Sequence, residues 1–136
     1  MTREEFYTKL LITGKKILPE LFMGVSHRPG RTWLGTTRKN FGLVVNRYES
    51  RVEMCIDRKT DEEVVLYKII SSQKKEIEQK FGEPLMISDE TKRGKLYWKT
   101  DLGFLNLAEH SQLSKILLDK IQKFIDAIDS SGLGNK

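Results

Sequence analysis

The sequence is poor in the residues that form covalent or metal cross-links. Among its 136 residues it has a single cysteine, Cys55, and only two histidines, His27 and His110. One cysteine excludes a disulfide within the chain, and this usage is typical of a protein from a reducing compartment. The three residues match no recognised zinc-binding spacing. We therefore expect no metal site of this kind.

Long apolar runs are also missing. No stretch approaches the roughly 20 apolar residues that span a bilayer. The first five residues, Met-Thr-Arg-Glu-Glu, lack the basic start and the apolar run of a secretory signal. These absences predict a cytoplasmic protein with no membrane partner.

The residues that are present describe one globular domain. Hydrophobic residues make up 38% of the chain, with ten glycines and three prolines, which excludes collagen-like and low-complexity classes. At this length a single core removes roughly 68% of the unfolded chain's surface from water, so cross-links are not needed. We predict one α+β domain over residues 1–129 and a flexible tail over residues 130–136.

Hydrophobic periodicity predicts three amphipathic helices and four to five strands. Each of the first two helices begins with a capping box, in which Thr2 precedes Glu5 and Thr60 precedes Glu63. The expected order α-β-β-β-α-β-β-α favours a mostly antiparallel sheet with the helices on one face. The elements are a helix over 2–18, an edge strand over 32–34, strands over 41–48 and 51–58, a helix over 60–81, strands over 85–88 and 95–100, and a helix over 111–129.

The second predicted helix has a broad apolar face and a clear end. Gly82 favours termination, and Pro84 prevents the helix from resuming. Helical spacing predicts that one stripe of side chains is buried against the sheet. This stripe comprises Val65, Leu66, Ile69, Ile70, Ile77 and Phe81.

The strands over 41–48 and 51–58 are separated by only two residues, which predicts a β-hairpin with a tight turn. A register that pairs Val45 with Met54 and Leu43 with Ile56 gives the hairpin one apolar face. A slip of one residue would mix apolar and polar side chains on both faces. The pattern therefore specifies which residues share a face.

The net charge of +5 is concentrated in one segment. Residues 26–59 hold eight arginines and lysines against three acidic residues, and the rest of the chain has sixteen of each sign. The planar guanidinium of arginine binds phosphate and stacks on bases, and aromatic residues are interleaved with the arginines. We therefore hypothesise that this segment forms a continuous basic surface that binds DNA or RNA. The candidate residues are Arg28, Arg31, Trp33, Arg38, Lys39, Arg47, Tyr48 and Arg51.

A metal-dependent nuclease, active or degenerate, is the second hypothesis. The run Asp57-Arg58-Lys59 has the spacing found in restriction-endonuclease-like enzymes, where acids hold a divalent ion and a lysine assists attack on phosphate. Alternation places Glu53 on the same face as Asp57, so the catalytic candidates are Glu53, Asp57 and Lys59, and Mg²⁺ is the implied cofactor. The element order is compatible with a restriction-endonuclease-like topology. Cys55 stands where the motif wants a lysine, so we favour a non-enzymatic role, without a cofactor.

A protein-interaction domain is the third hypothesis. It is favoured if the basic side chains are paired with acids and an apolar patch is exposed. Cys55, in the middle of a predicted strand, is interpreted as a packing residue rather than a nucleophile, because a nucleophilic cysteine needs a nearby base and an accessible thiolate.

Several short segments resemble one family across nearly the whole chain. They include Trp33-Leu34, the strand from Arg51 to Arg58, and above all the lysine- and glutamate-rich helix that ends in Phe81-Gly82-Glu83-Pro84-Leu85. These residues resemble the bacterial and archaeal domain of unknown function 4268 family. Members are often attached behind a nuclease-like domain, so the resemblance implies an accessory role near DNA, in defence or restriction systems. Because no such domain precedes these residues here, we expect that an association with a nuclease-like protein either involves a separate partner or is absent.

Overall fold

One antiparallel sheet and the helices on it make up the computed structural model, which describes residues 1–89, 92–106 and 110–131. Within these residues the α+β class with an antiparallel sheet is confirmed. The strands are β1 (Trp33–Gly35), β2 (Phe41–Val45), β3 (Ser50–Asp57), β4 (Met86–Asp89) and β5 (Arg93–Thr100). The helices are α1 (Arg3–Ile17), α2 (Pro19–Phe22), α3 (Asp61–Ser72), α4 (Lys74–Phe81) and α5 (His110–Ser130).

The strand order is β1-β2-β3-β5-β4, so two local hairpins are joined through the middle of the sheet. The first hairpin contains β2 and β3, and the second contains β4 and β5. The central pair, β3 and β5, is in register from Ser50 opposite Thr100 to Asp57 opposite Arg93. The edge strand predicted over 32–34 is β1, displaced by one residue.

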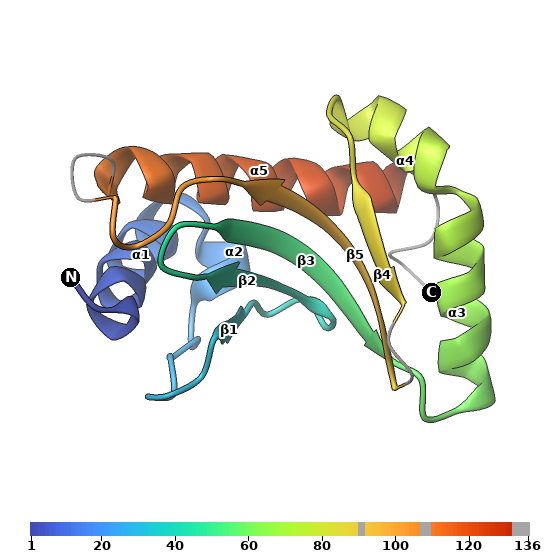
Figure 1. Ribbon diagram of the computed structural model, residues 1–136, viewed down its shortest axis with the longest axis horizontal. Helices are drawn as coiled ribbons and strands as arrows, with labels where there is room; N and C mark the ends of the chain where they lie inside the picture. Colours follow the sequence, from blue (N-terminus) through green and yellow to red (C-terminus); the bar gives the residue numbers. More distant parts are fainter. Residues whose placement is uncertain (90–91, 107–109, 132–136) are drawn as a thin grey trace.

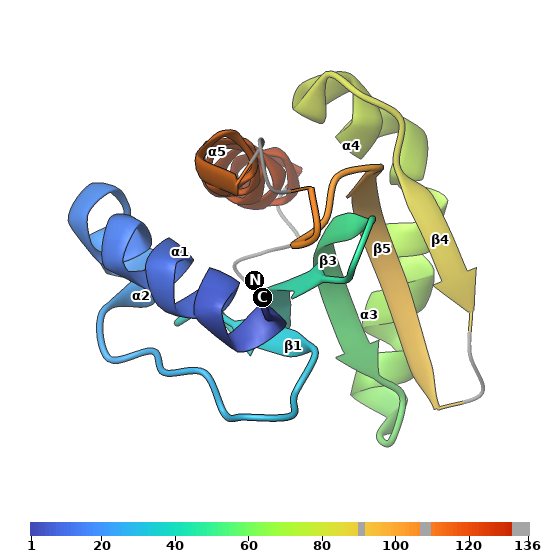
Figure 2. The same ribbon diagram turned by 60° about the vertical axis from the view of Figure 1, so that its left-hand side comes forward.

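The helices stand on one side of the sheet. Figure 1 shows α5 running across the strands, with α1 at one end of the sheet and α3 at the other. In Figure 2, where α5 is seen nearly end-on, α1 and α4 flank it. The core lies between α5 and the sheet, where Leu43, Val52 and Phe124 are each fully buried. In the part of the chain that the structure describes, no helix combines the length and the apolar character needed to cross a membrane.

The hairpin has the predicted faces but a different register. Val45 pairs with Ser50 rather than with Met54, and Leu43 pairs with Val52 rather than with Ile56. The turn contains the four residues 46–49 instead of two, and it is closed by the Asn46 N–H, which donates to the Glu49 carbonyl over 2.8 Å. Because this difference in pairing is an even number of residues, every side chain remains on the predicted face.

The predicted helix over 60–81 is two helices that meet at Gln73. The Thr60 hydroxyl caps α3 by accepting the Glu63 N–H, and Gly82 ends α4 in the left-handed region with φ 94°, so both predicted ends are confirmed. The predicted buried stripe is confirmed in α3 for Ile70, which is 1% exposed, but is wrong for Val65 and Ile69, which are 54% and 39% exposed. The bend at Gln73 turns α4 toward α5, so one straight stripe cannot face the core along both helices.

The first helix begins as predicted, with the Thr2 hydroxyl accepting the Glu5 N–H over 3.2 Å. It ends at Ile17, and the short helix α2 follows from Pro19. At the other end of the chain, α5 extends to Ser130, one residue beyond its predicted end. The predicted flexible tail over 130–136 lies outside the described residues from position 132 onward.

Candidate functional site on the open face of the sheet

The face of the sheet that points away from the helices carries mostly polar side chains. We call it the open face. Because side chains alternate along a strand, the odd-numbered residues of β3 and β5 lie on this face and the even-numbered ones face the core. A pocket of about 370 Å³ is hollowed into it beside β1. The odd-numbered residues are Arg51, Glu53, Cys55 and Asp57 of β3, and Arg93, Lys95, Tyr97 and Lys99 of β5.

The indole of Trp33 lies against two glycines of the open face. Gly35 of β1 and Gly42 of β2 are direct partners in the sheet. A Cβ atom on Gly42 would lie 2.5 Å from Cζ2 of Trp33, and one on Gly35 would lie 3.3 Å from its Nε1. Only residues without side chains leave room for the ring at this pair. The half-buried Trp33 thus lies close to the backbone and forms one wall of the pocket.

Glu53 lies in the middle of the open face and is only 1% exposed. It sits between Gly42 of β2 and Tyr97 of β5, which are its partners in the sheet. A guanidinium nitrogen of Arg51 is 3.8 Å from Oε1 of Glu53, and the guanidinium is stacked 4.4 Å from the centre of the Tyr97 ring. A buried carboxylate requires such compensation, because its transfer out of water is costly.

Cationic side chains continue along the open face toward the end of β3. Arg93 forms an ion pair with Asp57 over 3.2 Å, and Lys95 lies opposite Cys55 in the sheet. Burial raises the pKa of the Cys55 thiol, an effect larger than that of the Lys95 charge, which lowers it. Cys55 therefore stays a thiol at neutral pH, which agrees with its interpretation as a packing residue.

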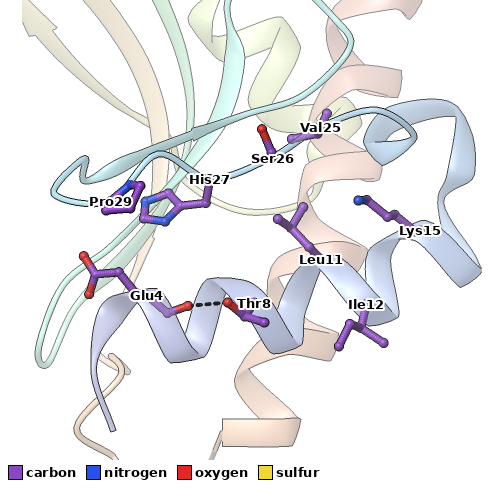
Figure 3. A pocket seen from close by; sticks show the side chains of 9 residues that line it. All are labelled: Glu4, Thr8, Leu11, Ile12, Lys15, Val25, Ser26, His27 and Pro29. Carbon is purple, nitrogen blue, oxygen red and sulfur yellow. Dashed lines mark hydrogen bonds between the residues drawn. The ribbon is translucent and has the colours of Figure 1, made fainter.

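The segment before β1 is fastened to α1 and carries Arg31 to the edge of the open face. Figure 3 shows His27 and Pro29 of this segment across from Glu4 of α1, with a pocket of about 340 Å³ between them. The Gly30 N–H donates to the Glu4 carboxylate over 3.3 Å, and the ring of His27 contacts the Arg31 carbonyl over 2.7 Å. Hydrogen bonds from its own N–H and from Gly30 lower the pKa of Glu4.

Three of the predicted nucleic-acid-binding residues lie on the open face, and the first two of them line its pocket. They are Arg31, Trp33 and Arg51, the last of which also pairs with Glu49 over 3.2 Å. The remaining predicted residues lie elsewhere: Lys39 lies near the start of α3, and Arg28, Arg47 and Tyr48 are exposed in loops.

The expectation that residues 26–59 form one continuous basic surface is wrong, because two of its arginines form ion pairs on the helix side of the molecule. Arg38 forms two hydrogen bonds of 2.8 and 3.0 Å with Asp129 of α5. Arg58 pairs with Asp89 over 2.7 Å and stacks on Tyr67 of α3. The basic residues of this segment therefore face different sides of the sheet.

The predicted catalytic residues are brought together only in part: Glu53 and Asp57 line the same pocket of the open face, and Lys59 does not line it. Glu53 and Asp57 are four residues apart on β3, which places their Cα atoms about 13 Å apart at the usual rise of a strand. Lys59 is exposed beyond the end of β3. Ligands of Mg²⁺ lie about 2 Å from the ion, so this pair of acids does not fit one magnesium site. Among the described residues, no three acidic, histidine or cysteine side chains gather as a metal-binding group.

The basic residues of β5 on the open face are not found by counting charge, because they lie outside the segment 26–59 that holds the whole charge excess. The signal that would have found them is the alternation in β5. Polar Arg93, Lys95 and Lys99 alternate with Leu96 and other core residues. This period of two predicts a strand with one face in the core and the other exposed to solvent.

An apolar groove on the helix side bears on the protein-interaction hypothesis. A pocket of about 560 Å³ lies beside α3 and is lined by Ile56, Leu66 and the exposed Val65 and Ile69. The partial pairing of the arginines and this exposed patch are the two conditions that the hypothesis requires. No partner chemistry is specified by the groove, so this role stays a prediction.

Comparisons with known proteins place the chain in a family. No curated protein and no solved structure matched the chain. The resemblance to a restriction-endonuclease-like topology therefore stays a prediction. The model of the family described as Domain of unknown function (DUF4268) matches residues 2–131 of the 136-residue chain, and the chain therefore belongs to this family.

Proposed function

We propose that this domain is a non-enzymatic accessory module that binds nucleic acid through the open face of its sheet. The observation that carries the proposal is the set of basic side chains that converge there from three separate segments. Five basic residues stand against three acidic ones, Glu49, Glu53 and Asp57. The basic residues are Arg31, Arg51, Arg93, Lys95 and Lys99.

The proposed site differs from the one expected from sequence. It keeps Arg31 and Arg51 from the segment 26–59 and adds three basic residues from β5. Arg38 and Arg58 form ion pairs with Asp129 and Asp89 on the helix side. Lys99 is exposed on the open face, where its ammonium lies 3.9 Å from Oε1 of Glu49. A basic face of this kind binds polyanions through phosphate contacts that release counterions. If three side chains contact phosphates, the slope of log affinity against log salt is about −2.7 for duplex and about −2.1 for single strands.

The proposal is tested with fluorescence anisotropy of labelled DNA and RNA of random sequence, single-stranded and duplex, at about 50 and 200 mM salt. The double variant Lys95→Ala and Lys99→Ala is expected to weaken binding and to flatten the salt dependence. The matched control is Lys68→Ala with Lys75→Ala, which removes two exposed lysines from α3 and α4 on the helix side.

The two double variants separate local contact from overall charge. Equal loss of binding in both would mean that net charge alone is responsible, and the open face would not be the site. The proposal would also be contradicted if the unaltered protein bound none of the four nucleic acids. Far-ultraviolet circular dichroism and melting of each variant ensure that a loss of binding is not a loss of folding.

A further inference from the structure

The Trp33 ring lies beside two glycines of the sheet and lines the open-face pocket. Its inner side lies against the glycine pair, Gly35 and Gly42, where a Cβ atom would meet the ring at 2.5 Å from Gly42. The indole atoms nearest to these glycines are Cζ2, Cε2 and Nε1, so the ring lies over the backbone of β1 and β2. Trp33 is half-buried and also lines the open-face pocket, so part of the indole remains accessible.

Cationic, polar and acidic groups surround this ring. The acidic ones are Glu53, which lies near Arg51, and Asp57, which pairs with Arg93. Arg31 and Lys95 line the same pocket as Trp33, and so do Thr32 and Asn40, whose polar atoms can form hydrogen bonds. The pocket volume of about 370 Å³ lies in the range that accommodates small ligands. An aromatic ring beside cationic side chains is the arrangement by which proteins bind unpaired bases, which stack on the ring while the cations contact the backbone.

We propose that the open face binds single-stranded nucleic acid, with one unpaired base stacked on Trp33 and the adjacent phosphates held by Arg31 and Lys95. The inference rests on the proposed function and specifies its ligand. In a duplex, both faces of each base are covered by neighbouring base pairs, so a ring inside a pocket cannot reach them. Phosphate contacts alone would favour the duplex, which has the higher charge density, whereas stacking on Trp33 favours the strand with free bases.

The first test uses the unaltered protein and its own fluorescence. The chain has two tryptophans, and Trp98 is 9% exposed on the core face, where Lys120 of α5 lies over its ring. A single-stranded oligonucleotide of mixed sequence is expected to quench the emission of Trp33, because the stacked base lies against its ring. The Trp33→Phe variant should bind single strands and show no such quenching, since only buried Trp98 remains.

The second test measures affinity by anisotropy for single strands and duplex of the same sequence. The Trp33→Leu variant is expected to weaken single-strand binding by about 5- to 150-fold, the range reported for loss of one stacked base. Its salt slope should be unchanged, since no phosphate contact is removed. Trp33→Phe should retain most of the affinity, and this conservative variant guards against a fold defect in Trp33→Leu.

The outcomes separate this inference from the proposed function. Equal affinity for duplex and single strands, or no quenching of Trp33 on binding, would overturn the single-strand inference while nucleic-acid binding stands. Binding to neither form would overturn both. Single-strand preference with an unchanged affinity in Trp33→Leu would also overturn it, because the preference would then come from another part of the protein.

Discussion

The Tyr7 hydroxyl connects α1 to the first two strands, and its removal should destabilise the protein. Tyr7 is fully buried. Its hydroxyl donates to the Thr32 carbonyl over 2.5 Å and accepts the Val45 N–H over 2.9 Å. Burial is the largest cause that raises the pKa of Tyr7, so the hydroxyl is protonated throughout the physiological range. The Tyr7→Phe variant keeps the ring and deletes both hydrogen bonds.

The loss of stability expected for Tyr7→Phe depends on whether each former hydrogen-bond partner of the hydroxyl is left buried or can bind water. Val45 is 0% exposed, so its N–H loses its tyrosine partner in the interior, at a cost of about 1–3 kcal/mol. Thr32 is exposed, and its carbonyl can bind water instead, which limits that loss to about 0.5–1 kcal/mol. We expect the free energy of unfolding to fall by about 1.5–4 kcal/mol in total. At this chain length each kcal/mol lowers the melting temperature by about 3–5 °C.

Urea denaturation followed by circular dichroism, together with thermal melting, measures this change. The matched control is Tyr48→Phe, which deletes the hydroxyl of a side chain that is 63% exposed and should change stability by less than about 0.5 kcal/mol. A Tyr7→Phe variant as stable as the Tyr48→Phe control would refute the reasoning, because the hydroxyl would then carry no net stabilisation.

Three further predictions concern other parts of the fold. Gly94→Ala should destabilise the protein by about 1–3 kcal/mol in thermal melts, because the new Cβ would lie 2.2 Å from the Tyr67 ring, and adding Tyr67→Leu should restore part of the loss. The side-chain hydrogen bond from Arg38 lowers the pKa of Asp129, so the pair stabilises the fold above the unfolded pKa of about 3.9 and ceases to do so as pH falls through the lower folded pKa. Asp129→Asn should therefore cost about 0.5–1 kcal/mol at pH 7 and flatten the acid limb of a plot of unfolding free energy against pH; an unchanged acid limb would contradict this. Cys55, whose pKa is raised by burial, should react with iodoacetamide at pH 7.5 more slowly than free cysteine, and a rate equal to that of free cysteine would show that the thiol is not protected.

Local sequence signals predicted the elements well where the information is local. The capping boxes at Thr2 and Thr60 and the glycine at position 82 were found because each signal lies within a few residues of the helix end that it specifies. The hairpin faces were also predicted, since side-chain parity depends only on alternation. These features follow from residue types alone.

The hairpin register could not be predicted, because distant segments hold the turn. The side chain of Arg3 donates to the Val45 carbonyl over 2.8 Å, and the Phe104 N–H donates to the Asn46 carbonyl over 3.0 Å. Added side-chain atoms on Gly103 would collide with the backbone of Asn46, so the turn and this segment are packed closely together. Contacts across more than forty residues leave no mark in a local pattern.

The candidate site was half predicted for a related reason. Charge counting identified Arg31 and Arg51 but also included Arg38, whose partner Asp129 is 91 residues away in the sequence. Which face of the sheet a side chain occupies depends on its position in its strand. Whether a basic side chain forms an ion pair depends on the acidic residues that the fold brings to that face. The β5 residues are found only when strand alternation is read together with charge.

The open face forms during folding only when β3 pairs with β5. Each hairpin is local, but the seam between them joins Asp57 to Arg93 across a stretch that contains α3 and α4. An excised peptide spanning the arginine-rich segment would carry Trp33 but lack every cation contributed by the second hairpin. The binding that we propose for this surface therefore requires both hairpins to be paired, and a chain in which they have not yet paired is expected not to bind nucleic acid.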